Sequence, residues 1–469
     1  MLVLIFAHFM DLMDVTIVNV ALPSIRADLG ASPAHLEWVV GAYTLGFAAV
    51  LITAGRLGDI VGRKRVFVAG VLTFTLTSLV AGLTHSPDIL VAARALQGIS
   101  AGLMMPQVLA SVQSLYAPAE RAPIYGTIGA VAGLAAVIGP LLGGWLITHD
   151  LLGLGWRAVF MINIPVGVLL ALSALLWVPD TRSADRPRLD VLGAVLATSG
   201  VGLVALGLIE GPAQDWDGGV WAALIAGPVI LLGWLVHQRR LEVLGRDPLV
   251  APHLFSNRGF SAGLLIQGTF QGAMAGFFFA LIIYLQAGRG FSAWDAGLSL
   301  LPFSVMAFLG SGAAVALTAG AGKFLVAVGA LMLMVGTLWT ARMVDAAPAT
   351  MTWHSLLVPL ALCGLGLGLF VVPLIDVALA TVDIREAGAA SGTYGMVQQL
   401  GAALGIAVVG VVFFGRAGRF DLASLTGAMV AAAVICAIGY TVCALAALAL
   451  PSPSDVTRRL AEVAEADES

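Results

Sequence analysis

Long apolar runs separated by short polar segments make up most of the chain. Each run has about twenty residues or more, enough for a helix to cross the ~30 Å hydrocarbon core of a bilayer. The pattern predicts an all-α protein with fourteen transmembrane spans. They are expected at residues 2–23, 37–56, 66–84, 88–110, 122–147, 157–178, 191–210, 218–236, 259–286, 292–318, 324–343, 355–381, 391–414 and 425–450.

The polar segment between the second and third spans differs from an ordinary loop. Residues 55–65 read G-R-L-G-D-I-V-G-R-K-R, with four basic residues and one acid in eleven positions. Its glycines allow a sharp turn and close helix approach. A plain positively charged loop would account for the basic residues but not for Asp59 or the glycine spacing.

Composition narrows the class of protein. The chain has 469 residues, of which 59% are apolar and 11% charged, whereas a soluble domain carries nearer 25% charged residues. Its mean hydropathy of +0.99 indicates a polytopic membrane protein. There is no basic patch outside the loops for nucleic acid and no ATP-binding P-loop motif. The cysteines and histidines show no spacing typical of disulfides, a metal site or catalysis, so neither a cofactor nor enzyme activity is expected.

The distribution of Lys and Arg predicts the orientation. Met1 to Pro23 lacks the basic start and cleavage site of a signal peptide and is expected to be the first span. Of the 23 Lys and Arg residues, sixteen lie on one side of the predicted membrane and six on the other. The excess marks the cytoplasmic side and places both termini there, in a plasma membrane.

Three sets of residues recur along the chain. Gly129 and Gly139 are repeated 266 residues later as Gly395 and Gly405. The pair of glycines at 98 and 102 recurs at 364 and 368, and Lys64 with Gly70 recurs as Lys323 with Gly329. The repeat is parallel. It predicts a six-helix bundle over 1–178, two inserted helices with linkers over 179–258, a second bundle over 259–450 and a cytoplasmic tail over 451–469.

These features resemble the major facilitator superfamily, in which two six-helix halves rock about a central site. Residues 55–65 are similar to its loop motif, and Arg94 to Gly98 to its arginine motif in the fourth span. Residues 129–144 resemble the antiporter motif of the fifth span. Residues 12–23, L-M-D-V-T-I-V-N-V-A-L-P, are similar to the first span of the fourteen-span drug:proton antiporters.

The resemblance implies roles for individual residues. The loop motif is expected to form a cytoplasmic gate, and the antiporter motif a seal against proton leak; helix packing is the alternative for the second. Arg94 is expected to lie near the acid of the first span and favour its deprotonation; a purely structural ion pair is the alternative. The gate residues are Gly55, Asp59, Gly62, Arg63 and Lys64, and the antiporter motif comprises Gly129, Gly139, Pro140, Gly143 and Gly144.

Charged residues inside a span are costly and therefore suggest function. Asp11 and Asp14 lie three residues apart on one helix face, so one of them is expected to hold a proton near neutral pH and release it when water arrives. The alternative is that Asp14 only fixes helix packing. Asp376 is expected either to bind cationic substrate or a proton, or to lie in water at the cytoplasmic opening.

The other candidate substrate contacts are polar or aromatic residues of the spans, namely Asn19, Tyr43, Gln97, Gln271 and Gln398. We therefore expect a monomeric, proton-coupled exporter of amphipathic, drug-like compounds that works by alternating access. A dedicated exporter or importer of one metabolite fits the sequence as well. A membrane-embedded enzyme and a non-transporting sensor are less consistent with it.

Overall fold

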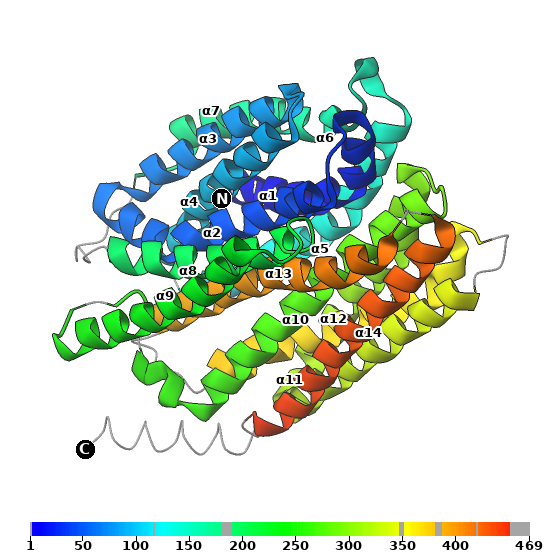
Figure 1. Cartoon of the computed structure of the whole chain (residues 1–469). Coiled ribbons are helices and arrows are strands. Elements are labelled where there is room, and N and C mark those ends of the chain that lie inside the picture. Colours follow the sequence, from blue (N-terminus) through cyan, green and yellow to red (C-terminus); the bar gives the residue numbers. More distant parts are fainter. Residues whose placement is uncertain are drawn as a thin grey trace.

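The computed structural model describes residues 2–115, 118–180, 190–246, 248–250, 252–346, 351–379, 387–418 and 421–450; some side chains within these ranges, most of them in α5, are not described. Figure 1 shows a bundle of long helices. The main helices are α1 (Leu2–Leu29), α2 (Pro33–Val61), α3 (Arg63–Leu83), α4 (Pro87–Leu115), α5 (Pro118–Thr148), α6 (Ala158–Met161), α7 (Asn163–Trp177), α8 (Val191–Glu210), α9 (Gly218–Val243), α10 (Arg258–Ile283), α11 (Ala293–Ala346), α12 (Leu357–Leu379), α13 (Ala387–Ala417) and α14 (Leu422–Ala446).

The fourteen predicted spans coincide with helices. Among the described residues, thirteen helical segments are long and apolar enough to cross a membrane. The fifth predicted span corresponds to α5, of which Val137–Thr148 is described as an apolar stretch. The short helices η1 (Leu151–Gly153), η2 (Gly155–Arg157) and α6 lead into α7, and η4 (Tyr284–Gly288) extends α10. The all-helical prediction is therefore confirmed.

Helix α11 contains two of the predicted spans. Its 54 residues are assigned as one helix, but Gly310 and Gly329 both contact the same stretch of α12, between Leu365 and Phe370. Nineteen residues of straight helix would separate the two glycines by about 28 Å. The chain must therefore reverse direction between them, and the two parts cross separately as Ala293–Val315 and Gly322–Ala346.

The predicted repeat corresponds to repeated helix contacts. A Cβ atom on Gly98 of α4 would overlap the backbone of Tyr43, and one on Gly364 of α12 would overlap the backbone of Phe303 in the same way. Gly70 packs on Ser100 as Gly329 packs on Gly366. These pairs follow the sequence offset, so the two halves of the chain form matching small-residue helix contacts.

The inserted helices lie over the seam between the halves. Helix α8 packs against α9, and it also contacts α2 from the first half and α13 from the second (Figure 1). Ala205 of α8 shares an apolar cluster with Leu45 and Ala407. Asp190 joins α8 to α9, because its Oδ2 accepts from Gln238 Nε2 at 2.7 Å. Burial opposes ionisation of Asp190, but hydrogen bonds from His237, Gln238 and Gly193 outweigh it and hold the pKa of Asp190 below its usual value.

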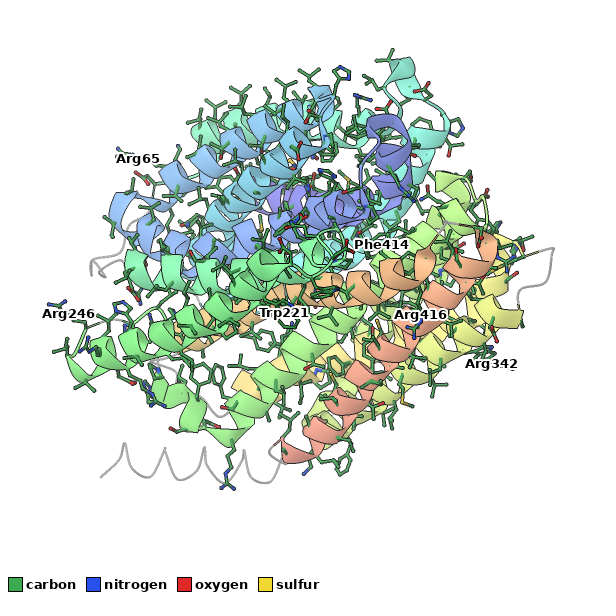
Figure 2. All side chains as sticks on the ribbon, viewed as in Figure 1. Arg65, Trp221, Arg246, Arg342, Phe414 and Arg416 are labelled. Carbon is green, nitrogen blue, oxygen red and sulfur yellow. The ribbon has the colours of Figure 1, made fainter. Side chains whose placement is uncertain are left out.

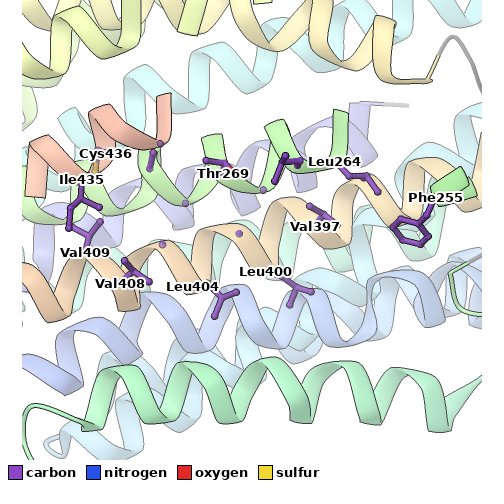
Figure 3. Close-up of a pocket in the computed structure, with 17 residues that line it drawn as sticks. Phe255, Leu264, Thr269, Val397, Leu400, Leu404, Val408, Val409, Ile435 and Cys436 are labelled. Atoms are coloured by element: carbon purple, nitrogen blue, oxygen red, sulfur yellow. The ribbon is translucent and has the colours of Figure 1, made fainter. Parts of the chain in front are cut away.

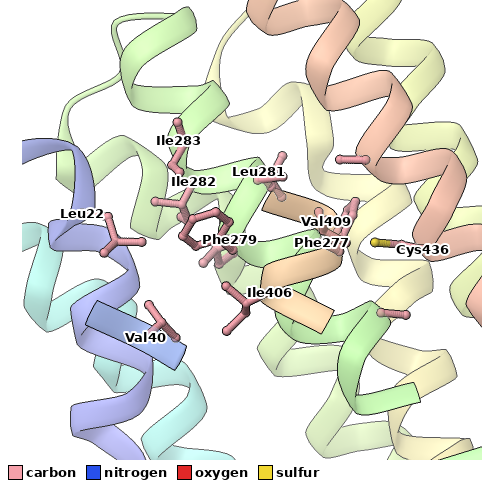
Figure 4. Packing of buried hydrophobic residues seen from close by; sticks show 14 of the residues in the cluster. Leu22, Val40, Phe277, Phe279, Leu281, Ile282, Ile283, Ile406, Val409 and Cys436 are labelled. Carbon is pink, nitrogen blue, oxygen red and sulfur yellow. The ribbon is translucent and has the colours of Figure 1, made fainter. Parts of the chain in front are cut away.

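The two ends of the bundle differ in how the halves meet. We call the end where α1, α5 and α13 finish the Leu29 end, and the opposite end the Asp59 end. One continuous apolar core joins the halves toward the Leu29 end, where Leu22 and Val40 lie near Ile282 and Ile406 (Figure 4). Toward the Asp59 end the cores are separate, one around Phe67 and Met104 and the other around Phe260 and Tyr394. Apolar packing thus closes the seam at the Leu29 end.

Charged residues gather at the two ends of the helices. Arg65 and Arg246 lie at the left of Figure 2, at the Asp59 end, and Arg342 and Arg416 lie at the right, at the Leu29 end. Many large apolar side chains on the outer helix faces are exposed, such as Leu176 at 74% and Leu232 at 62%. A continuous apolar surface between two charged rims is the arrangement that a bilayer requires.

The repeated glycine contacts yield a stability prediction. Gly98→Val and Gly364→Val each force a side chain into the backbone of a neighbouring helix, and we expect a loss of about 1–3 kcal/mol for each. Gly202→Val in α8 is the matched control, because a Cβ there meets no atom within 4 Å. Thermal unfolding of the purified variants in detergent checks this. Equal stability of all three variants would contradict the packing described here.

Candidate functional site

Asp14 lies at the centre of a buried polar network. Its Oδ2 accepts a hydrogen bond from Arg94 Nη1 at 2.6 Å. Its Oδ1 accepts from Gln97 Nε2 at 3.0 Å and from Asn163 Nδ2 at 2.7 Å. Asp14 is 0% exposed and Arg94 is 1% exposed. The carboxylate is thus bound by one cation and two amides inside the first half of the chain.

Several helices position this network. Asp14 comes from α1, Arg94 and Gln97 from α4, and Asn163 from the start of α7. Ser78 of α3 completes it, since its Oγ accepts from Gln97 Nε2 at 2.8 Å and from Asn163 Nδ2 at 3.3 Å. Arg94 and Gln97 are three residues apart on α4, which puts both side chains on one face. Arg94 Nη1 also donates to Gln97 Oε1 at 2.7 Å.

The guanidinium of Arg94 is held on further sides. Its Nε donates to the carbonyl oxygen of Val39 at 3.0 Å. Its Cζ lies 4.3 Å from the ring centroid of Tyr43, a cation–π distance. The Tyr43 hydroxyl in turn donates to Asp11 Oδ1. Asp11 and Asp14 therefore approach one cation from two directions, Asp14 directly and Asp11 through Tyr43.

Breaking the Asp14–Arg94 ion pair costs more free energy than forming it provides. A buried ion pair gains little net stability because both charges lose water, but removing one partner typically costs about 3–5 kcal/mol. Adding a proton to Asp14 has the same effect as removing its charge, and it leaves Arg94 buried with its charge uncompensated. The network can therefore couple the protonation of one carboxyl group to the packing of five helices, α1, α2, α3, α4 and α7.

Four of the five predicted gate residues lie at the α2–α3 turn; Gly55 lies about two turns earlier in α2, facing Pro106 of α4. Gly62 has a φ of 116°, a conformation that side chains disfavour. Arg63 Nη2 donates to Asp59 Oδ1 at 2.9 Å, and Arg63 Nη1 donates to the carbonyl oxygen of Ala110 in α4 at 2.9 Å. Lys64 Nζ donates to the Leu175 carbonyl oxygen of α7 at 2.7 Å. The turn thus connects the ends of α2, α3, α4 and α7.

Glycines of the antiporter motif provide close approaches on both sides of α5. Gly139 lies against Thr16 of α1, and Gly143 against Ile17. Gly144 faces the backbone of Ala293 at the start of α11, and the carbonyl of Pro140 lies against Gly297. Gly129 lies in α5, but its surroundings are outside the part of the chain whose side chains are described. The motif therefore packs α5 between the first span and the second half.

The candidate substrate residues do not lie together. Gln97 and Tyr43 are fully buried members of the Asp14 network. Asn19 is half-buried and donates to the Val15 carbonyl of its own helix. Gln271 and Gln398 are half-buried, and Asp376 is exposed near the end of α12. No hydrogen bond joins Gln271, Gln398 and Asp376 to one another in the described part of the chain.

Three polar residues of importance were missing from the sequence-based prediction. Ser78 and Asn163 complete the Asp14 network, and Glu37 lies buried in α2. Ser and Asn are common in membrane spans and lack charge, so they give no hydropathy signal. Glu37 is the first residue of the predicted second span, where an acid is unremarkable, and only the three-dimensional packing shows that it is buried.

The described cavity lies elsewhere, between α10, α13 and α14, with a volume of about 560 Å³ (Figure 3). Its walls are almost entirely apolar, and Leu264, Leu400, Leu404, Val408 and Ile435 lie around it. All three helices belong to the second half of the chain. Because no charged residue lines it, the cavity fits an apolar molecule or lipid chain and does not include the predicted substrate residues.

Comparison with known proteins assigns the family. Residues 4–406 match the sequence profile of the Major Facilitator Superfamily. The chain belongs to this superfamily. It is accordingly a membrane transporter of small molecules and not an enzyme, as the sequence motifs implied.

Curated relatives of this superfamily member match most of its length. The probable actinorhodin transporter of Streptomyces coelicolor is 39% identical, over 90% of this chain and 73% of that protein. The cephamycin export protein CmcT of Amycolatopsis lactamdurans is 37% identical, over 86% and 82%. The multidrug resistance protein Stp of Mycobacterium tuberculosis is 32% identical, over 86% and 73%.

Solved structures of the superfamily share the fold. A bacterial homologue of the human lysosomal transporter Spinster, in an inward-facing and occupied conformation, aligns with a TM-score of 0.67 and 17% identity, over 95% of each chain. A proton-dependent oligopeptide transporter aligns with a TM-score of 0.68 and 17% identity, over 98% of this chain and 99% of that one. At this identity the likeness is one of architecture.

The Asp14 network predicts non-additive stability effects. Arg94→Leu leaves Asp14 buried without its cation, so we expect a loss of about 3–5 kcal/mol. Combining it with Asp14→Leu removes both charges and is expected to restore part of that loss. Thermal unfolding of the single and double variants forms the double-mutant cycle. Additive losses would show that the two residues are not energetically coupled.

Proposed function

We propose that this transporter exports amphipathic, drug-like or antibiotic molecules in exchange for protons. The observation that carries the proposal is the Asp14–Arg94 ion pair, buried in an otherwise apolar bundle and linked to four helices. The names of the relatives support export, since they describe antibiotic transporters and resistance proteins. Charged residues inside membrane spans cost free energy and commonly mark ion or proton pathways, which favours proton coupling here.

The proposed coupling step is a proton moving to and from Asp14. When Asp14 is ionised, it holds Arg94 with Gln97 and Asn163, as in this structure. When it is protonated, the attraction to Arg94 weakens and the guanidinium depends on the Val39 carbonyl and the Tyr43 ring. The proton can shift the balance of conformations only by its different affinity for each of them. The changed surroundings of Asp14 supply that difference.

Alternating access is proposed to open and close the seam between the halves. In this structure the shared apolar core closes the Leu29 end. At the other end, the Asp59–Arg63 pair is half-buried and joined to α4. A pair of this kind is worth about 0–1 kcal/mol, so it can break in every cycle. Residues 1–178 and 259–450 would act as the two moving bodies; residues 181–189 and the tail over 451–469 lie outside the described residues.

The orientation follows the charge distribution. Arg56, Arg63, Lys64 and Arg65 place the Asp59 end at the cytoplasm by the positive-inside rule. Both termini then lie inside the cell and the closed Leu29 end faces outward. We propose a monomer in the plasma membrane, because each half packs its core within the single chain.

A second candidate function is export or import of a single metabolite by the same fold. Two of the relatives are named for one compound each, actinorhodin and cephamycin. The apolar cavity between α10, α13 and α14 does not decide between one substrate and many. Growth inhibition of a pump-deficient host by a broad panel of toxic compounds, with and without this protein, separates the two candidates.

Asp14→Asn is expected to abolish proton-driven efflux while the protein remains folded and inserted, because the amide keeps the shape but cannot carry the proton. The measurement is efflux of a protected compound from the panel, in everted vesicles with an imposed pH gradient. Asp345→Asn is the matched control, since Asp345 is exposed and pairs only at the surface with Arg342 at 3.3 Å. Retained proton-coupled efflux in the Asp14 variant would exclude the mechanism.

A further inference from the structure

Glu37 is a buried acid that the Asp14 network does not use. It lies one turn into α2, is 3% exposed, and its Oε2 has no hydrogen-bond partner among the described residues. Its carboxyl group lies directly against Gly410 of α13, where any Cβ atom would overlap it. Glu37 therefore sits between the two halves of the transporter, inside the seam that is closed at the Leu29 end.

Few charged groups face this carboxyl group. Helix α8 contributes Glu210 at its last position, and Glu210 acts on Glu37 through space as a like charge. Glu210 is itself held by Trp38, whose Nε1 donates to its Oε1 at 3.0 Å. Helix α13 contributes Arg416, which is exposed six residues beyond Gly410. On α2 itself, His35 is held by Ser32 and Asp88.

Among the described residues no ion pair joins Glu37 to Arg416, His35 or another basic side chain, so its charge would be uncompensated in the closed seam. An ionised carboxylate without hydrogen bonds is strongly disfavoured in an apolar interior, and a nearby carboxylate disfavours it further. A protonated carboxyl group is neutral and fits against the bare backbone of Gly410. The closed seam is thus compatible with the protonated acid and not with the ionised one.

We propose that Glu37 is a second proton-binding site, which takes up a proton as the α2–α13 seam closes at the Leu29 end and releases it as the seam opens to water. The site rests on the proposed proton-coupled function and adds to it a group that senses the conformation directly. The inserted helix α8 takes part through Glu210, which gives this helix a role in the coupling.

The sign of the pH dependence follows from linkage. The closed state binds the proton on Glu37 more tightly than the open state, so low pH favours closure and rising pH favours opening. A proton that reaches Glu37 from outside the cell would favour closure of the seam at the Leu29 end. In an antiporter this is the direction of movement that returns the binding site to the cytoplasmic side.

The test measures the distance across the seam by electron resonance of two spin labels. Ala27→Cys and Ala423→Cys place the labels on exposed positions of α1 and α14 at the Leu29 end. The native cysteines Cys363, Cys436 and Cys443 are buried, and the chain without the introduced pair is the labelling control. Distances are recorded in lipid nanodiscs from about pH 5 to about pH 9.

In the labelled chain that keeps Glu37, we expect the distance between the two spin labels to increase as the pH rises. Glu37→Gln should retain the short distance at pH values where the parent populates the long one. Glu210→Gln removes the like charge and should shift the opening midpoint to higher pH. An unchanged pH response in Glu37→Gln would overturn the proposal, even if Asp14→Asn abolishes efflux and the proposed function stands.

Infrared spectroscopy provides a second measurement that does not require opening. A protonated carboxylic acid has a carbonyl band that a carboxylate lacks. The native protein at neutral pH should show this band, Glu37→Asp should shift one component of it, and Glu37→Gln should lose that component, while a proton on Asp11 or Asp14 contributes a component that neither substitution changes. A spectrum in which the band is the same in all three proteins would show that Glu37 does not carry the proton, whatever the outcome of the transport assay.

Discussion

The structure depends on one constraint: a charge in an apolar bundle must be matched by partners that the bundle itself supplies. Asp14 and Arg94 satisfy each other, and the remaining acceptor and donor atoms are occupied by Gln97, Asn163 and the Val39 carbonyl. Each partner comes from a different turn or helix. Helices α1, α2, α4 and α7 therefore cannot shift independently while the pair is charged. The pair is at once a structural restraint and a site that responds to a proton.

Close helix packing makes this network possible. Gly98 allows α4 to approach the backbone of Tyr43, and this approach brings the Arg94 guanidinium over the Tyr43 ring. The second half repeats the approach at Gly364 but carries Cys363 where the first half has Gln97. The duplication thus preserved the packing of the small residues and not the buried charges. The asymmetry places the proposed proton chemistry of Asp14 in the first half and leaves the second half with an apolar cavity.

The same constraint applies to Glu37, an acid buried in the seam between the two halves. At the Leu29 end the halves share one core, and Glu37 lies within it against Gly410 without a counter-charge. The hydrogen-bond partners of Asp14 all come from the first half, whereas the environment of Glu37 exists only while the two halves touch. Protonation of Asp14 is therefore proposed to act on helix packing within the first half, and protonation of Glu37 on the contact between the halves. The inserted helix α8 spans the same seam, so it is placed to influence both halves.

The class of protein, the number of spans and the family can be inferred from the amino-acid sequence. Apolar runs of sufficient length have no stable alternative to a membrane helix, and the motifs around Asp14, Asp59 and Arg94 are local enough to be recognised in the chain. Which polar residues meet depends on how the helices pack in the folded chain. Ser78 and Asn163 join Asp14 from sequence distances of 64 and 149 residues, and Glu37 is buried by a glycine in another helix 373 positions away. Hydropathy records how polar each segment is, but the cost of burying a charge depends on partners that only the folded chain brings together.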